Sequence, residues 1–439
     1  MKSNIITKRS VLYIIVNKDL NYHKGFNLRL GRKLPAYILI TILLIVTGDD
    51  LTLSPGAVVA RSYMFSIASW EIKHFPDKWM NLLRESWPGN KPSRQKRLQV
   101  IDEYLEISLL ANKERERLKG DSKFQYGSTR STGSANDAGH DFGEHLDQLM
   151  DRKMELKYTA EEALESELSK AIINEGFGSR LGLIFPPVDL AFADPPTVLV
   201  TSPRDRIFRL ETLLLAPEIS AFERNIIEEE IFENYDLSSL VVDLSGLSTY
   251  PTITSDQAPL RAVLQTAAHE WLHAYLFFKP LGFKHSTSEE MYTLNETVAD
   301  LAGRELGDAT FALMGGDLGI SSYRFQAGED RFPRFTSEMR ETRMEVDRYL
   351  QNGQIEEAEN YMKERWWFLA LRGYRLRKLN QAYFAFYNMY GQSSVSISPI
   401  GDQVKEFRSH FLDTGSFVRA VSQVSSYAEF LNLLESYGD

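Results

Sequence analysis

The sequence predicts an α+β fold that is predominantly helical and contains a small β-sheet. Charged segments with apolar residues at helical spacing predict long helices at 94–119 and 152–176. Short apolar runs bounded by proline or other turn residues predict strands at 197–201 and 239–244. Beyond these runs the helical period returns, so the region 336–438 is expected to be helical throughout.

A short apolar segment near the start of the chain predicts a membrane anchor. Residues 34–48 carry no charge and lie between the basic stretch 1–33 and Asp49-Asp50. A basic flank of this kind stays in the cytoplasm, so the segment is expected to be an uncleaved signal-anchor that holds the rest of the chain on the extracytoplasmic side. Two alternatives remain, namely a cleaved signal peptide that releases a secreted protein and a buried helix of a soluble protein.

The composition divides the chain further. Gly, Ser, Thr, Asn and Asp are concentrated at 120–143, and residues 126–150 are expected to be a linker. The predicted organisation is therefore a basic cytoplasmic tail (1–33), a hydrophobic signal-anchor (34–48), a helical region (49–125), a linker (126–150) and one large domain (151–439).

Charge and cysteine content limit the possible partners. The chain has 439 residues and a formal net charge of −10, although residues 1–33 carry eight Lys or Arg against one Asp. The remainder is therefore strongly acidic, which argues against a nucleic acid as partner. There is no cysteine, so disulfides, thiolate ligands and thiol chemistry are excluded.

Residues 269–273 read His-Glu-Trp-Leu-His and lie in a segment expected to be helical over about 260–279. Two histidines four residues apart lie on one face of a helix, where His269 and His273 can both reach one zinc ion. Glu270 can then act as a general base toward water on the metal. The alternative is an amphipathic helix with two surface histidines. The apolar residues around the motif oppose it, because buried His and Glu need partners.

A second motif completes the expected metal site. Residues 295–300 read Asn-Glu-Thr-Val-Ala-Asp in a helix expected over 289–306. Glu296 can supply the third ligand of one Zn²⁺ ion, which leaves a fourth position for water. Asp300 shares the helix face of Glu296 and can accept the outer N–H of a ligating histidine. Glu289 and Glu290 are rival ligands, but neither has an aspartate four residues later.

The two motifs together resemble those of the gluzincins, the thermolysin-like zinc metallopeptidases. The resemblance covers about 260–305 and implies that His269, His273 and Glu296 are zinc ligands, Glu270 the general base and Asp300 an outer-shell carboxylate. No Gly-x-Met-Glu-Asn sequence is present, so an aminopeptidase assignment is not supported. The residues after His273 exclude the metzincins, and the family within the gluzincins stays open.

The resemblance implies two further features of a zincin-like catalytic domain. Gluzincins use a downstream Tyr, His or Arg to stabilise the oxyanion of the tetrahedral intermediate. Zincins also bind an extended substrate along an edge strand before the metal helix, and residues 239–244 (SLVVDL) are the candidate, with an ordinary core strand as the alternative. The candidates for the oxyanion role are Tyr374, Arg375, Tyr383, Tyr387 and His410.

The predicted function is hydrolysis of a peptide bond in a peptide or protein substrate by one zinc ion with Glu270 as base. A non-catalytic, membrane-anchored binding or scaffold protein that keeps zinc for folding is the main alternative. A zinc hydrolase acting on a non-peptide amide is a third possibility. The sequence predicts neither the cleavage specificity nor the oligomeric state.

Overall fold

The computed structural model describes residues 53–74, 93–125, 135–319 and 333–438, and Ser54–Asp439 forms one compact unit. The predicted basic tail and signal-anchor lie outside the described residues. Among the helices of the described part, none is both long and apolar enough to cross a bilayer. The unit is mostly helical with two small sheets, which confirms the predicted α+β class.

The first sheet is antiparallel with the strand order β3-β2-β4. Successive side chains of the central strand, β2, point to opposite faces of the sheet, so they pack into two different hydrophobic cores. Val198 and Val200 face one group of helices, whereas Leu199 faces the other. The strands are β2 (Thr197–Pro203), β3 (Glu211–Leu215) and β4 (Leu237–Asp243). The face with Val198 and Val200 packs on α11 (Pro333–Gln351), α12 (Ile355–Leu371) and α13 (Gln381–Tyr387). The face with Leu199 packs on α3 (Pro55–Val59) and α7 (Ala221–Tyr235).

The second sheet has the order β1-β6-β5, with β1 parallel and β5 antiparallel to the central strand. It packs against the helix that carries the HEWLH motif. The strands are β1 (Leu190–Phe192), β5 (Gly246–Leu247) and β6 (Thr252–Thr254).

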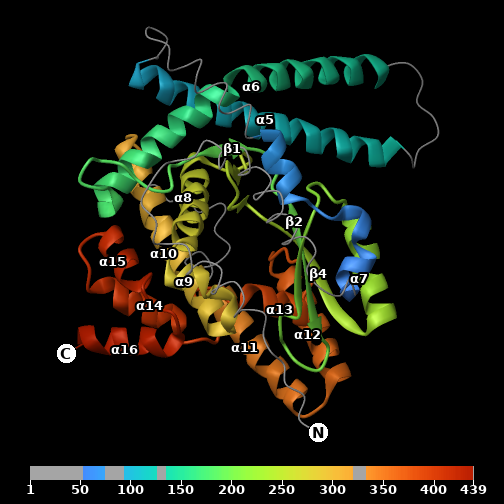
Figure 1. Cartoon of the computed structure of the whole chain (residues 1–439). Helices are drawn as coiled ribbons and strands as arrows, with labels where there is room; N and C mark the ends of the chain where they lie inside the picture. Colours follow the sequence, from blue (N-terminus) through green and yellow to red (C-terminus); the bar gives the residue numbers. More distant parts are fainter. Residues whose placement is uncertain (1–52, 75–92, 126–134, 320–332, 439) are drawn as a thin grey trace, which may run out of the picture. The chain divides into compact units, whose positions relative to one another are not determined.

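The two motif helices, α8 (Leu260–Phe277) and α10 (Glu289–Leu313), pack along each other (Figure 1). Two glycines of α10 allow this close approach. A Cβ atom on Gly303 would lie 2.8 Å from the Cα of His269, and one on Gly307 would lie 2.5 Å from the Cα of Gln265. The guanidinium of Arg261 binds Asp308 through two hydrogen bonds of 2.6 and 2.7 Å and joins the beginning of α8 to α10.

Helices α5 (Arg94–Gln125) and α6 (Ala135–Ile172) pack on each other and on the motif helices. Helix α6 begins at Ala135, so residues 135–150 of the predicted linker are helical, whereas residues 126–134 lie outside the described residues. The Tyr104 hydroxyl of α5 donates to buried Asp256 at 2.5 Å, and Lys153 of α6 binds the same carboxylate. Helix α5, which precedes the predicted linker, therefore belongs to the same compact unit as α6.

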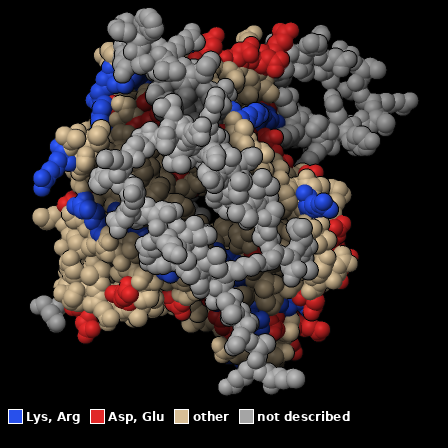
Figure 2. All heavy atoms as spheres, viewed as in Figure 1, with Lys and Arg blue, Asp and Glu red and all other residues tan. Residues whose placement is uncertain are grey.

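Acidic side chains gather at the top of the view in Figure 2, where Figure 1 places α6. Asp147, Asp151 and Glu155 of this helix are exposed. Such a face repels the phosphates of a nucleic acid.

The chain after residue 332 is built of helices and, in its described part, contains no strand. The expectation that 336–438 is helical throughout holds only in part, because residues 372–380 are not helical and the next helix begins only after Asn380, whose side chain caps it by accepting from the N–H of Tyr383 at 2.9 Å. The end of the chain, from residue 400 onward, is divided into three short helices. The final elements are α14 (Ile400–Ser409), α15 (Thr414–Val421) and α16 (Tyr427–Gly438).

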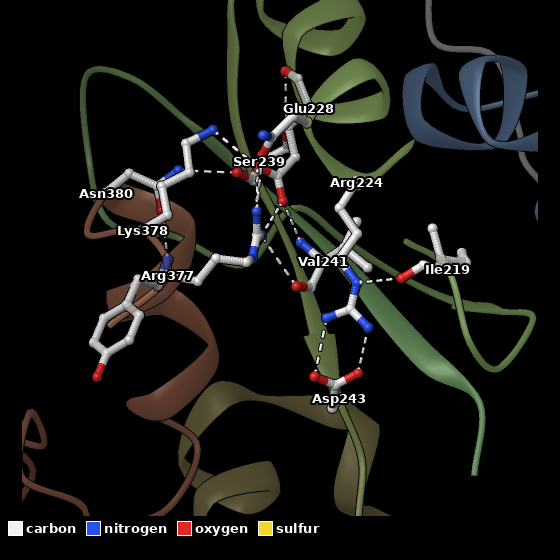
Figure 3. A network of polar contacts seen from close by, with 11 residues as sticks. Ile219, Arg224, Glu228, Ser239, Val241, Asp243, Arg377, Lys378 and Asn380 are labelled. Carbon is white, nitrogen blue, oxygen red and sulfur yellow. Dashed lines mark hydrogen bonds and ion pairs between the residues drawn. The ribbon is translucent and has the colours of Figure 1, made fainter. Parts of the chain in front are cut away.

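Strand β4 lies at a sheet edge, but side chains occupy its outward hydrogen-bonding groups (Figure 3). Val241 donates its N–H to the buried Glu228 carboxylate of α7 at 2.7 Å, and its carbonyl accepts from Arg377 at 3.1 Å. The Ser239 carbonyl accepts from the Asn380 amide at 2.9 Å. The expectation that 239–244 receives an extended substrate is therefore wrong, and the strand is an ordinary core strand.

Glu228 is the centre of this network, since its carboxylate also binds Arg377 and Lys378. We expect Glu228→Gln to lower the free energy of unfolding by about 2–3 kcal/mol, because it leaves two cations without their buried partner. Urea unfolding followed by circular dichroism measures the change. The exposed neighbour Glu229 is the matched control, and an equal effect of Glu229→Gln would contradict a specific role for Glu228.

Candidate metal centre

Three predicted ligands come together between α8 and α10. The Nε2 atoms of His269 and His273 lie 3.0 Å apart, and the Glu296 Oε2 atom lies 3.8 and 3.6 Å from them. Two nitrogen ligands of a tetrahedral zinc ion, each at about 2.0–2.1 Å, are separated by about 3.3 Å. The donor types and their convergence therefore fit one such ion. Glu289 and Glu290 are exposed in the first turn of α10 and are not part of the group.

The charges of the three groups are set by burial and by one another. Burial and the neighbouring His273 lower the pKa of His269 to about 3, so this ring is neutral. Burial opposes a charge on His273, yet the Glu296 carboxylate raises the pKa of that ring to about 9. Burial also opposes ionisation of Glu296, but His273 holds its pKa at about 2. Without metal, His273 therefore carries the one proton that an incoming cation must displace.

Glu270 points into the same space from α8. Burial raises the pKa of its carboxyl to about 7, close to the value that suits proton transfer at neutral pH. The backbone of Ser248 forms a hydrogen bond to this carboxyl group. Gly246 also contacts Glu270, since a Cβ atom there would lie 2.9 Å from its Cγ. The segment that begins with β5 therefore fixes the position of Glu270.

The hydrogen-bond partners that the structure gives to the rings of His269 and His273 differ from the predicted partner, Asp300. Asp300 accepts two hydrogen bonds from Arg304, at 3.1 and 2.6 Å, and burial raises the pKa of its carboxyl. The His273 ring instead forms a hydrogen bond to the Asn295 side chain, and His269 to the backbone of Ala299. The contacts of the Asp300 carboxylate thus run to Arg304, one turn further along α10, and its predicted role toward a ligating histidine stays a prediction.

Tyr292 is a further contact of Glu296 that sequence reasoning missed. It lies one turn before Glu296 on α10 and forms hydrogen bonds to that residue and to Arg209. Burial and the Glu296 charge raise the pKa of Tyr292 to about 12. The Arg209 guanidinium lies 3.7 Å from the centre of the ring. The i, i+4 spacing of Tyr292 and Glu296 was the available signal.

The three groups and Glu270 line a cavity of about 830 Å³. Its wall is mainly apolar and aromatic, with β5 and the following residues 248–250 on one side. The apolar part includes Val198, Leu214, Leu244, Leu247, Phe277 and Phe386. The candidate metal centre is therefore open to a ligand of considerable size, unlike a closed structural site.

None of the five predicted oxyanion residues belongs to the described lining of this cavity. Tyr383 and Tyr387 are packed in the helical core beside the first sheet, and Tyr374 packs on Phe335 with ring centres 4.8 Å apart. His410 lies against Tyr437 of α16. The fifth candidate, Arg375, lies in the connection before α13. The structure therefore brings none of the five predicted candidates to the cavity that holds the three ligand groups.

Tyr390 lines the cavity instead. Burial and the charges of Glu296, Glu270 and Asp300 raise its pKa well above the usual value. Its hydroxyl is therefore neutral and able to donate a hydrogen bond beside the candidate metal centre.

No family model, no curated protein and no solved structure matches the chain.

Proposed function

We propose that the chain is a zinc-dependent metallopeptidase of the gluzincin type, which hydrolyses a peptide bond in a peptide or protein substrate. One observation carries this proposal: His269, His273 and Glu296 converge beside the half-buried Glu270 on the wall of a large cavity. A site that holds zinc only for folding needs neither the cavity nor a carboxyl group with a pKa of about 7.

The roles of the residues follow from their positions. His269, His273 and Glu296 would hold the ion. When bound, zinc supplies Lewis-acid chemistry that polarises a carbonyl and acidifies water. Glu270 takes a proton from the attacking water and delivers it to the nitrogen of the leaving amine. Tyr292 and Arg209 orient Glu296, and Asn295 orients His273.

Strand β5 is the sheet edge along which we place an extended substrate. The edge of β4 is occupied as described above, and that of β1 is occupied by Glu161 and Glu165 of α6, which accept from the N–H groups of Phe192 and Leu190. The β3 edge pairs with residues 63–65. Because β5 also lines the cavity, a peptide added to it would pass the catalytic groups.

Tyr390 is proposed to donate a hydrogen bond to the oxyanion that develops on the scissile carbonyl. We expect Tyr390→Phe to lower kcat by about a hundredfold or more with little change in KM, because the bond is made mainly in the transition state. Steady-state kinetics on a cleaved peptide measures both constants. Tyr387→Phe is the control, and an unchanged kcat in Tyr390→Phe would remove this assignment.

The proposal is tested by incubating the zinc-loaded full chain with a peptide library and analysing the products by mass spectrometry. We expect cleavage that stops when a chelator removes the metal and returns when zinc is restored. Loss of the fold on chelation, with no peptide cleaved beforehand, would favour the binding or scaffold alternative. Cleavage of small non-peptide amides in a parallel incubation, with no peptide of the library cleaved, would favour the third possibility.

A further inference from the structure

An exposed apolar surface continues outward from the cavity. It is formed by the tight turn 179–185, where the Ser179 N–H bonds to the Leu183 carbonyl at 2.8 Å, and by the end of α8 with α9 (Pro280–Phe283). The rings of Phe185 and Phe278 lie 5.1 Å apart and join the two segments. We call this surface the apolar rim; its six side chains, each more than half exposed, are Leu181, Leu183, Phe185, Phe277, Phe278 and Phe283.

The apolar rim lacks a partner within the described part of the chain. Leu181, at the tip of the turn, is 84% exposed, and Phe283 is 73% exposed. Soluble proteins rarely leave a contiguous apolar surface of this kind without a binding role. Three of its phenylalanines, Phe185, Phe277 and Phe278, also line the cavity, so whatever covers the rim lies at the cavity mouth.

The charges around the apolar rim identify its partner. Arg180, Lys279 and Lys284 border it, and none of them forms an ion pair with a described residue. The ammonium groups of the two lysines lie beside the rings of Tyr275 and Phe283. Residues 177–188 and 271–288 contain no Asp or Glu, although acidic residues outnumber basic ones in the whole chain. Phosphate groups are the natural counter-ions for the three cations at the border of the apolar rim.

We infer that the apolar rim docks on the surface of an anionic lipid bilayer. Exposed phenylalanines and leucines with basic residues at their border match the interfacial region, where rings enter the headgroup level and cations meet lipid phosphates. The cavity mouth then faces the membrane surface, and substrates reach it from there. This inference needs neither peptidase activity nor a particular placement of residues 1–53.

The absence of cysteine allows a direct test with the full chain. Leu181→Cys is labelled with an environment-sensitive fluorophore and compared with Leu412→Cys, a fully exposed leucine between α14 and α15. With vesicles of phosphatidylcholine and phosphatidylglycerol, we expect the label at 181 to shift to the blue and to be quenched by lipids that carry a quencher in the acyl chain. The label at 412 should show neither change.

A charge variant tests the basic border. Lys279→Gln combined with Lys284→Gln should raise the vesicle concentration for half of the spectral shift at 181 by about 25-fold, since each lost charge weakens binding by about fivefold. Lys96→Gln with Lys363→Gln, at two exposed lysines of α5 and α12, is the control pair. Absence of a response at 181, an equal response at 412, or a response independent of phosphatidylglycerol would overturn the inference and leave a protein partner as the occupant of the rim.

Discussion

Glu270→Gln should retain one zinc ion per chain and lose peptide hydrolysis by at least about a thousandfold in kcat. The change keeps the size of the side chain and its hydrogen bond to the Ser248 backbone, but the amide cannot take a proton from water. General acid–base groups contribute about 10²–10⁴ in rate, and Glu270 is proposed to act in both steps of the reaction. Metal analysis and steady-state kinetics on the same preparation measure the two quantities.

The exposed Glu290 provides the control for this experiment, since Glu290→Gln removes the same charge from the first turn of α10. We expect its zinc content and its kcat to equal those of the wild type. If Glu270→Gln retained more than about a tenth of the wild-type kcat, another group would have to be the base, and the proposed mechanism would be wrong.

The second large effect is a loss of zinc affinity, and it is expected from a change at Gly303, which touches no substrate. Gly303→Ala places a Cβ atom 2.8–2.9 Å from the Cα, Cβ and N atoms of His269, so the backbones of α8 and α10 must move apart. Overpacking costs about 1–3 kcal/mol, which the better helix propensity of alanine offsets by about 1 kcal/mol. The fold therefore survives, while the displaced His269 is expected to weaken zinc binding by about a hundredfold, because metal ligands tolerate only small displacements.

Competition with a chromogenic chelator measures the zinc affinity of this variant. The matched change is Gly438→Ala near the end of α16, where an added Cβ atom meets nothing within 4 Å. Wild-type affinity in Gly303→Ala would show that the close contact of α8 with α10 does not position His269.

The motif helices could be predicted because their signal is local. The expected ranges, about 260–279 and 289–306, agree with α8 and with the first two thirds of α10. The second helix extends further since Leu306 and Thr310 continue its buried face. The spacing of His269, His273 and Glu296 likewise let us predict that these residues meet.

The rest of the site depends on contacts between segments that are far apart in the sequence. The spacing of residues within one segment does not predict such contacts. Tyr390 lies almost a hundred positions beyond Glu296, and nothing in its neighbourhood distinguishes it from Tyr383 or Tyr387, which are packed in the core. Strand β5 is two residues long and bounded by turns, too short for a periodic signal. The edge of β4 seemed free until Glu228 of α7 and Arg377 closed it.

The metal content of the purified full chain is the measurement that tests the central claim most directly. Wild type, His273→Ala and Glu296→Ala are compared by titration with zinc after removal of bound metal. We predict one zinc ion per wild-type chain and much weaker binding in both variants, because each removes one of three converging ligands. No zinc in the wild type, or an affinity unaffected by Glu296→Ala, would contradict the three-ligand site and the proposed activity with it.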